Sequence, residues 1–211
     1  MKGNKPKPSS RTAAPRQVRI IGGQWKRTPL GVPDAQGLRP TPDRVRETVF
    51  NWLNHLIDGQ WDDIVCLDLF AGTGALGFEA ASRGAGQVTM VEASAAAVRQ
   101  LEASKEKLHA GQVRILHGDA LTTAQRLAAR GSEAGNRFNL VFLDPPYHQD
   151  WLPKVLSVCE HLLTDNGMVY AESEQAFDNN LLPAWLEGWE VVRADKAGMV
   201  NFHLLKRNGK L

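Results

Sequence analysis

The chain has 211 residues, 43% of them apolar and 23% charged, which suits an ordinary globular protein with one domain and a modest appendage. No apolar run approaches the roughly 20 residues of a membrane span, and no apolar stretch follows the basic N-terminus, so we expect neither a membrane protein nor a secretory signal. Residues 1–46 hold eleven Lys or Arg and two Asp or Glu, a net charge of +9, whereas residues 47–211 carry −7, and this asymmetry favours a polyanionic partner for the N-terminal region over a merely solubilising tail.

The first 40 residues divide into two basic segments. Residues 1–16 carry five basic side chains, no acidic one and no large apolar one, which predicts a disordered basic leader. Residues 17–40 are expected to form a basic hairpin and a loop, with two short strands around a turn at Gly22-Gly23. The basic face of this hairpin would carry Arg19, Lys26 and Arg27.

A helix is predicted to follow residue 40. Thr41 is the expected N-cap, and Pro42 occupies the first helical position. Apolar residues then recur at spacings of three and four and would form one buried face, which consists of Val45, Val49, Trp52, Leu53 and Leu56. This helix opens the domain predicted for residues 41–211.

From residue 62 onward, short apolar runs alternate with helical segments. Such alternation is typical of βαβ units and a parallel sheet. The predicted strands are Ile64–Phe70, Gln87–Val91, Val113–His117, Leu140–Leu143 and Met168–Ala171. The predicted helices span 75–83, 94–109, 120–130 and 150–163. Two closing strands, Trp189–Ala194 and Val200–Lys206, would form an antiparallel hairpin, which gives a seven-stranded, mostly parallel α/β sheet.

A glycine turn follows the first strand of this sheet. Gly72, Gly74 and Gly77 match GxGxxG, and Glu92 lies at the end of the next strand, 20 residues after Gly72, where an acid that binds ribose belongs. The pattern indicates a cofactor that contains adenosine, without saying which one.

Asp68 favours S-adenosylmethionine over a nicotinamide cofactor. Its carboxylate precedes the glycine turn, where it suits an ammonium and a sulfonium group and would sit poorly beside a pyrophosphate. Asp119, after the third strand, either accepts a hydrogen bond from the adenine amine or caps the helix over 120–130, and one residue could do both. Phe70, Ala71 and Ala120 adjoin these positions and complete the predicted cofactor contacts.

The fourth strand runs directly into Asp144-Pro145-Pro146-Tyr147. Two prolines after a strand stop sheet pairing and hold a stiff loop at the rim where the cofactor is expected. The Asp144 carboxylate and the Pro145 carbonyl can each accept one hydrogen of an aromatic amine, which aims the nitrogen lone pair at an electrophilic methyl group. The Tyr147 ring can stack on an extruded base. A plain strand-terminating turn is the alternative, but it leaves the preceding cofactor motifs unused.

Five segments together resemble the RsmD-type 16S ribosomal RNA guanine-N2 methyltransferases. They are RIIGGQWK at 19–26, LRPTPDRVRETVFNWL at 38–53, DLFAGTGALG at 68–77, VEAS at 91–94 and LDPPY at 143–147. The glycine turn and DPPY are shared with many amino-methyltransferases, and the two N-terminal segments narrow the resemblance to this family.

The resemblance implies a class I S-adenosylmethionine-dependent methyltransferase fold. The implied substrate is the N2 amine of guanine 966 in 16S rRNA, within the assembled 30S particle. Apart from the resemblance, we expect a cytoplasmic protein, a monomer by default, and no metal site. By matching motif, the cofactor contacts are Asp68, Gly72, Gly74, Glu92 and Asp119, and the adjoining Phe70, Ala71 and Ala120 are predicted with them. The catalytic loop is Asp144, Pro145, Pro146 and Tyr147. Arg39 and Thr41 match a segment that caps the active site, and the predicted RNA contacts are Arg19, Lys26, Arg27, Arg39 and Thr41.

Three other functions explain part of the pattern. A DNA adenine-N6 methyltransferase uses the same DPPY chemistry, but it usually needs a large target-recognition region. A non-catalytic RNA-binding module explains the basic N-terminal region but not the cofactor motifs. An NAD-dependent dehydrogenase explains the glycine turn and leaves DPPY idle.

Overall fold

The computed structural model describes residues 17–32, 41–130 and 137–208. The predicted leader over 1–16 lies outside these ranges, as do Arg39 and most of the predicted loop. Within the described ranges, none of the helices combines the length and the apolar character that crossing a membrane would require.

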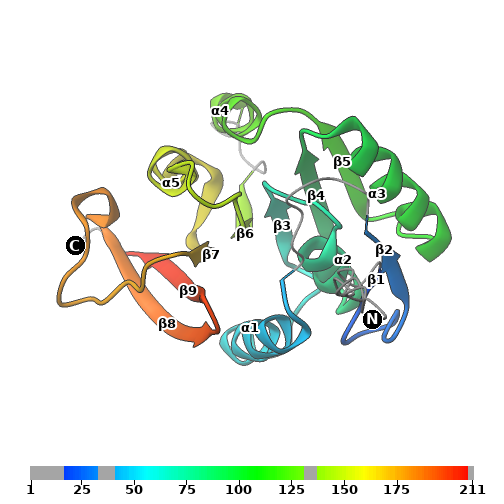
Figure 1. Ribbon diagram of the computed structural model, residues 1–211, viewed down its shortest axis with the longest axis horizontal. Helices are drawn as coiled ribbons and strands as arrows, with labels where there is room; N and C mark the ends of the chain where they lie inside the picture. Colours follow the sequence, from blue (N-terminus) through cyan, green and yellow to red (C-terminus); the bar gives the residue numbers. More distant parts are fainter. Residues whose placement is uncertain (1–16, 33–40, 131–136, 209–211) are drawn as a thin grey trace, which may run out of the picture.

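A seven-stranded sheet forms the centre of the molecule, with the strand order β5-β4-β3-β6-β7-β9-β8 (Figure 1). Strands β3 to β7 pair in parallel, whereas β9 runs antiparallel to both of its neighbours. This arrangement confirms the predicted mostly parallel sheet with a C-terminal antiparallel hairpin. The strands are β3 (Val65–Asp68), β4 (Gln87–Glu92), β5 (Val113–His117), β6 (Phe138–Leu143), β7 (Leu163–Ser173), β8 (Trp189–Ala197) and β9 (Val200–Arg207).

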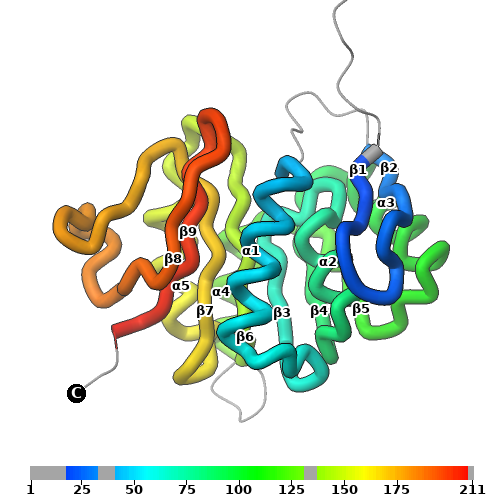
Figure 2. Tube along the Cα trace, turned by 90° about the horizontal axis from the view of Figure 1, so that it is seen from below, coloured from blue at the N-terminus to red at the C-terminus, as the bar shows by residue number. Residues whose placement is uncertain are grey.

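Helices cover both faces of this sheet and make a three-layered molecule (Figures 1 and 2). The helices are α1 (Asp43–Leu56), α2 (Ala75–Ser82), α3 (Ala95–Leu108), α4 (Ala120–Arg130) and α5 (Trp151–Leu162). In β6, Leu140 and Phe142 pack into the core cluster that includes residues of α1, α2 and α3. Val141 and Leu143 pack into the cluster that includes residues of α4 and α5. Both faces of the strand are buried, which is why its sequence is a continuous apolar run.

The N-terminal hairpin is present, but its turn is not the one predicted. Its antiparallel strands are β1 (Gln17–Arg19) and β2 (Pro29–Gly31). Gly22 and Gly23 do not form a tight turn between them; they cross the end of α2, where the Gln24 N–H donates to the Ser82 carbonyl at 2.7 Å. A Cβ on Gly23 would overlap that carbonyl oxygen, so glycine serves a close approach of two backbones.

The start of α1 also differs from the prediction. Pro42, and not Thr41, is the capping residue, and no side chain caps the helix. The Thr41 hydroxyl does not cap the helix because it donates to the distant carboxylate of Asp144 at 3.0 Å. The predicted apolar face is confirmed, since Val45 and Val49 are buried and the remaining members of the face pack against the same core.

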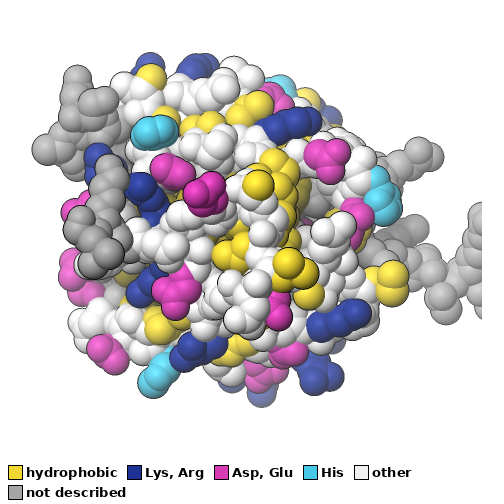
Figure 3. All heavy atoms as spheres, turned by 90° about the vertical axis from the view of Figure 1, so that its left-hand side faces the viewer, with side chains coloured by type: hydrophobic (Ala, Val, Ile, Leu, Met, Phe, Trp, Pro, Cys, Tyr) yellow, Lys and Arg dark blue, Asp and Glu magenta, His cyan; other side chains and the backbone are white. Residues whose placement is uncertain are grey.

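Strand β8 forms one edge of the sheet and carries exposed charged side chains. These are Glu190, Arg193, Asp195 and Lys196. Figure 3 shows the side of the molecule on which β8 and β9 lie, where charged groups of both signs surround a band of apolar side chains. Charges on an edge strand oppose pairing with a strand of another molecule.

Candidate active site

The strand order reverses at β3. The chain builds outward through β4 and β5 on one side and then returns to place β6 on the other side. Ligands of open parallel sheets bind in the crevice at the carboxyl ends of the strands, at such a switch point. Asp68, at the end of β3, pairs with Phe142 of β6, and Asp144 follows two residues later. The fold therefore brings the two predicted motifs to the same rim of the sheet.

The glycine turn after β3 is closed by the carboxylate of Asp68. Its two oxygens accept hydrogen bonds from the Phe70 N–H at 3.3 Å and from the Gly77 N–H at 3.2 Å. Gly74 has a φ of +77°, and a Cβ there would lie 2.6 Å from the ring of Phe78. A side chain there would also clash with buried Leu101, so only glycine fits where the turn packs against the core.

The Asp68 carboxyl is buried, and its pKa is raised to about 7. Burial is the largest cause, and the negative charge of Glu92 adds to it. The two backbone N–H groups oppose the shift because they favour the carboxylate. A cation placed beside Asp68 would further favour the ionised form.

Glu92 is held at the end of β4 by two backbone hydrogen bonds. Its oxygens accept from the Gly72 N–H at 2.8 Å and from the Ser94 N–H at 2.7 Å. A carboxylate has about four acceptor positions, so it retains capacity for two further donors. Glu92 is partly exposed at the rim, so these remaining acceptor positions are accessible to a ligand.

Asp119 caps α4, as one of its two predicted roles requires. Its Oδ1 accepts from the Thr122 N–H at 2.8 Å, and its side chain is exposed. The neighbouring predicted contacts lie along the same rim. Ala120 begins α4, and Phe70 makes an edge contact with Trp151 at the start of α5, with 5.6 Å between ring centroids.

The Asp144 carboxylate lies partly buried in an acidic environment. Thr41 donates to its Oδ2, and the carboxyl of Glu172 adjoins it on β7. Burial raises the pKa of Asp144 well above its usual range, and the charges of Glu172 and Asp68 raise it further, against the opposing effect of the Thr41 hydrogen bond. Pro145 is buried, and Tyr147 is partly exposed at the rim.

The sequence reasoning missed Glu172 and Tyr170. Glu172 is 3% exposed, and its Oε1 accepts from the Tyr170 hydroxyl at 2.8 Å. A signal for Glu172 was present, since an acidic residue ends an apolar run. Its proximity to Asp144 depends on β7 pairing with β6, which a single sequence does not specify.

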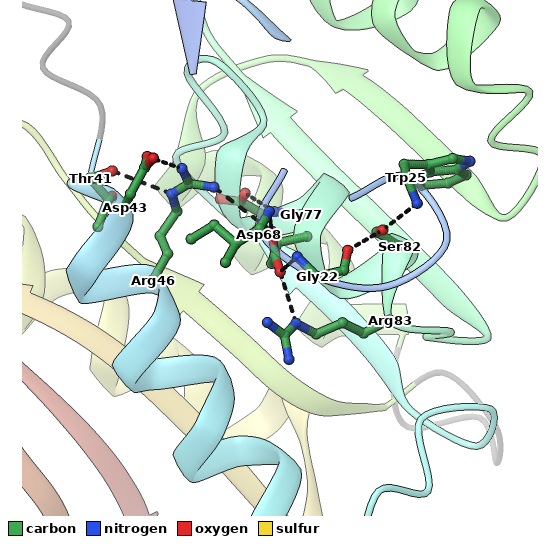
Figure 4. A network of polar contacts seen from close by, with 11 residues as sticks. Gly22, Trp25, Thr41, Asp43, Arg46, Asp68, Gly77, Ser82 and Arg83 are labelled. Atoms are coloured by element: carbon green, nitrogen blue, oxygen red, sulfur yellow. Dashed lines mark hydrogen bonds and ion pairs between the residues drawn. The ribbon is translucent and has the colours of Figure 1, made fainter. Parts of the chain in front are cut away.

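A buried ionic network connects the hairpin to this site (Figure 4). The Glu79 carboxylate on α2 accepts from the Ile21 N–H at 2.7 Å and the Gly22 N–H at 2.8 Å, and it pairs with Arg46 at 3.8 Å. The Arg46 Nε in turn donates to the Thr41 carbonyl at 3.3 Å. The network therefore fixes the segment whose hydroxyl holds Asp144.

The predicted RNA contacts are distributed over two places. Arg19, Lys26 and Arg27 are exposed on the hairpin, which lies beside α2 and α3 (Figure 2). Thr41 lies at the predicted catalytic loop, where it contacts Asp144, whereas Arg39 falls outside the described residues. Trp25 is half-buried and packs against the core, so it anchors the hairpin to the domain.

The sequence of this chain is similar to that of a known protein family. The profile of the family described as "Conserved hypothetical protein 95" matches residues 18–206. The "Ribosomal RNA small subunit methyltransferase D" of Escherichia coli strain K12 is 40% identical over 92% of each chain. The chain belongs to this methyltransferase D family.

Solved structures agree with that membership. The Escherichia coli protein YhhF superimposes on this family member with a TM-score of 0.75 and 38% identity, covering 92% of this chain and 99% of that one. SMU.776, crystallised with S-adenosylhomocysteine, shares the fold at a TM-score of 0.66 and 17% identity, covering 92% and 56%. The predicted class I methyltransferase fold is thereby confirmed.

Proposed function

We propose that this protein transfers a methyl group from S-adenosylmethionine to the exocyclic N2 amine of a guanine in 16S rRNA, guanine 966 by resemblance, within the assembled 30S particle. The observation that carries the proposal is the placement of Asp144. A buried network holds its carboxylate at the switch point, opposite the glycine turn. The family relative named as a small-subunit rRNA methyltransferase supports the substrate class.

The residues at the rim fit S-adenosylmethionine. Asp68 would balance the ammonium and sulfonium charges, Glu92 would accept from the ribose hydroxyls, and Asp119 would accept from the adenine amine while it caps α4. Gly72 and Gly74 have φ values of +51° and +77°, which give the turn beside these carboxylates its shape. The cofactor, when bound, supplies an electrophilic methyl group.

The Asp144 loop would prepare the amine. A base amine is a weak nucleophile because its lone pair is delocalised into the ring. The Asp144 carboxylate and the Pro145 carbonyl each accept one amine hydrogen, which turns the lone pair out of the ring plane and towards the methyl group. Alignment of this kind provides on the order of 7–11 kcal/mol in well-oriented reactions. Stacking on Tyr147 would contribute roughly 1–3 kcal/mol to holding the base.

The basic N-terminal segment would bind the RNA. We assign residues 17–40 to RNA contact, with Arg19, Lys26, Arg27 and Arg39, and residues 41–211 to catalysis, with Thr41 at the boundary. A domain this small gains specificity most readily from an assembled particle. The charged edge strand β8 supports a monomer.

The test is incubation with labelled S-adenosylmethionine and 30S particles from cells that lack this methylation. Naked 16S rRNA and duplex DNA serve as parallel substrates. We expect label on one guanine of the particle, as N2-methylguanine. Label on DNA adenine alone would favour the DNA methyltransferase, and binding to RNA without transfer would favour the non-catalytic module.

A further inference from the structure

The pairing of β6 with β7 places a second carboxyl beside Asp144. Leu143 of β6 is the partner of Ala171 in the parallel register, so Asp144 and Glu172 are the next residues of two adjacent strands. Adjacent strands lie roughly 5 Å apart, and paired positions direct their side chains to the same face. Each carboxyl shifts the pKa of the other, as neighbours within hydrogen-bonding reach do.

The surroundings of this pair supply donors and negative charge. Thr41, before α1, donates to Asp144, and Tyr170, on β7, donates to Glu172. Asp68 on β3 and Tyr147 on the loop add negative or potentially negative charge nearby. None of these four groups is a cation. Phe202, the partner of Glu172 on β9, contributes only an apolar ring.

Among the described residues, the groups named around this pair include no cation, and two such neighbouring carboxyls, one buried and one partly buried, do not both ionise. Burial raises the pKa of Asp144 and also that of Glu172, so a proton is retained between them at a pH where isolated carboxyls have lost theirs. A hydrogen bond between a carboxyl and a carboxylate is charge-assisted and short, and it fixes the direction of both groups.

We propose that Glu172 is a positioning residue of the transfer reaction, which shares one proton with Asp144 and thereby holds the oxygen of Asp144 that faces the amine. This inference rests on the proposed function for its catalytic consequence. The pair carries one negative charge instead of two, and the shared proton and Thr41 together restrain the Asp144 side chain.

The pair also provides a destination for the proton that the reaction releases. As the nitrogen–methyl bond forms, the sulfur–methyl bond of the donor would break and leave its electron pair on the sulfur, so the nitrogen becomes positively charged and still holds both of its hydrogens. One N–H bond then breaks, its electron pair returns to nitrogen, and an O–H bond forms on Asp144. The singly protonated, negatively charged pair thus becomes a neutral pair with two protons. The second proton passes to water when the product leaves.

The experiment compares Glu172→Gln with the wild type in single-turnover transfer to 30S particles over a range of pH. The glutamine amide can donate to Asp144 and accept from Tyr170, but it cannot lose its proton. We expect transfer near the wild-type rate at neutral pH. As the pH rises, the wild type should slow by up to about tenfold per pH unit while it loses the shared proton, and Glu172→Gln should not.

Two further variants complete the set. Glu172→Leu removes the donor and should lower transfer about 100-fold through misplacement of Asp144, with S-adenosylmethionine binding unchanged. Glu190→Gln, the same substitution as the first but on the exposed edge strand, should match the wild type at every pH. Parallel pH profiles for wild type and Glu172→Gln would overturn the proposal, because they would show a structural role alone.

A second measurement does not depend on the substrate. Carbon-13 NMR of the labelled carboxyl groups should show Asp144 titrating in two coupled steps in the wild type. The upper step should be absent in Glu172→Gln. A single step in both proteins would contradict the shared proton, even if the rRNA assignment were correct. If Asp144 titrates in two steps but the protein methylates no guanine, the proposed function is refuted and the shared proton of Asp144 and Glu172 is still supported.

Discussion

Replacing Asp68 by Asn should make the protein more stable and the cofactor site weaker. The folded protein holds a proton on Asp68 up to a pH of about 7, whereas the unfolded chain releases it near 3.8. Below the lower value both states are protonated and Asp68 has no effect on stability. Between the two values only the unfolded state ionises, so the free energy of unfolding falls as the pH rises, and the full penalty is present above about 7.

The magnitude follows from the size of the shift. At 1.36 kcal/mol per unit, a displacement from 3.8 to about 7 corresponds to about 4 kcal/mol. Asn keeps one acceptor oxygen, so either the Phe70 or the Gly77 N–H loses its partner, at a cost of about 1 kcal/mol. Asp68→Asn should therefore be about 3 kcal/mol more stable at pH 8 and close to the wild type near pH 4 to 5.

The assays are urea unfolding from pH 4 to 8 and calorimetric titration with S-adenosylmethionine. The substitution should weaken cofactor binding roughly 10- to 100-fold at pH 8, as expected for loss of a charged hydrogen bond. Wild-type affinity should fall as the pH drops below about 7, because Asp68 then takes up a proton. A stability difference that does not change with pH, or unaltered cofactor affinity, would refute this account of Asp68.

Three other perturbations test the remainder of the site. Thr41→Val removes the donor to Asp144 and should slow transfer about tenfold without loss of stability. Thr41→Ser keeps a hydroxyl and should transfer at the wild-type rate. Equal rates for the two variants would show that this hydrogen bond does not contribute to transfer. Glu79→Gln removes the buried negative charge that faces Arg46 and Arg83, while Arg46 keeps its ion pair with Asp43 at 2.6 Å. The substitution should lower the free energy of unfolding by about 1.5–3 kcal/mol, and a loss below about 1 kcal/mol would mean that the ionic network is not essential. Charge reversal of Lys26 and Arg27 should weaken 30S binding and reduce the slope of affinity against salt by about one for each phosphate that the variant no longer binds; an unchanged slope would direct attention to other surfaces.

Local patterns were sufficient to predict the sheet and its helices. Strands buried on both faces are continuous apolar runs, and glycine and proline mark their ends, so six of the seven strands could be placed to within about three residues. Strand β7 was predicted too short. The register between β6 and β7 shifts after Phe138, and the polar residues 164–167 are accommodated there instead of ending the strand.

The errors arose where a distant partner overrides a local preference. Thr41 is a good helix cap, but the carboxylate of Asp144 is an available long-range acceptor. Gly22-Gly23 is a good hairpin turn, but α2 passes so close that glycine is needed there. Glu172 lay beyond prediction for the same reason, because its role depends on strand register. Motifs within one segment could be identified, and the pairing of distant segments could not.

The central claim is that Asp144 prepares the amine and does not merely support the fold. The measurement that tests it most directly is Asp144→Ala, with cofactor affinity and single-turnover transfer to 30S particles determined on the same preparation. We predict that affinity for S-adenosylmethionine survives while transfer falls at least about 10²- to 10³-fold. If binding and transfer disappear together, Asp144 belongs to the structural framework, and if transfer persists, another group accepts the amine hydrogens.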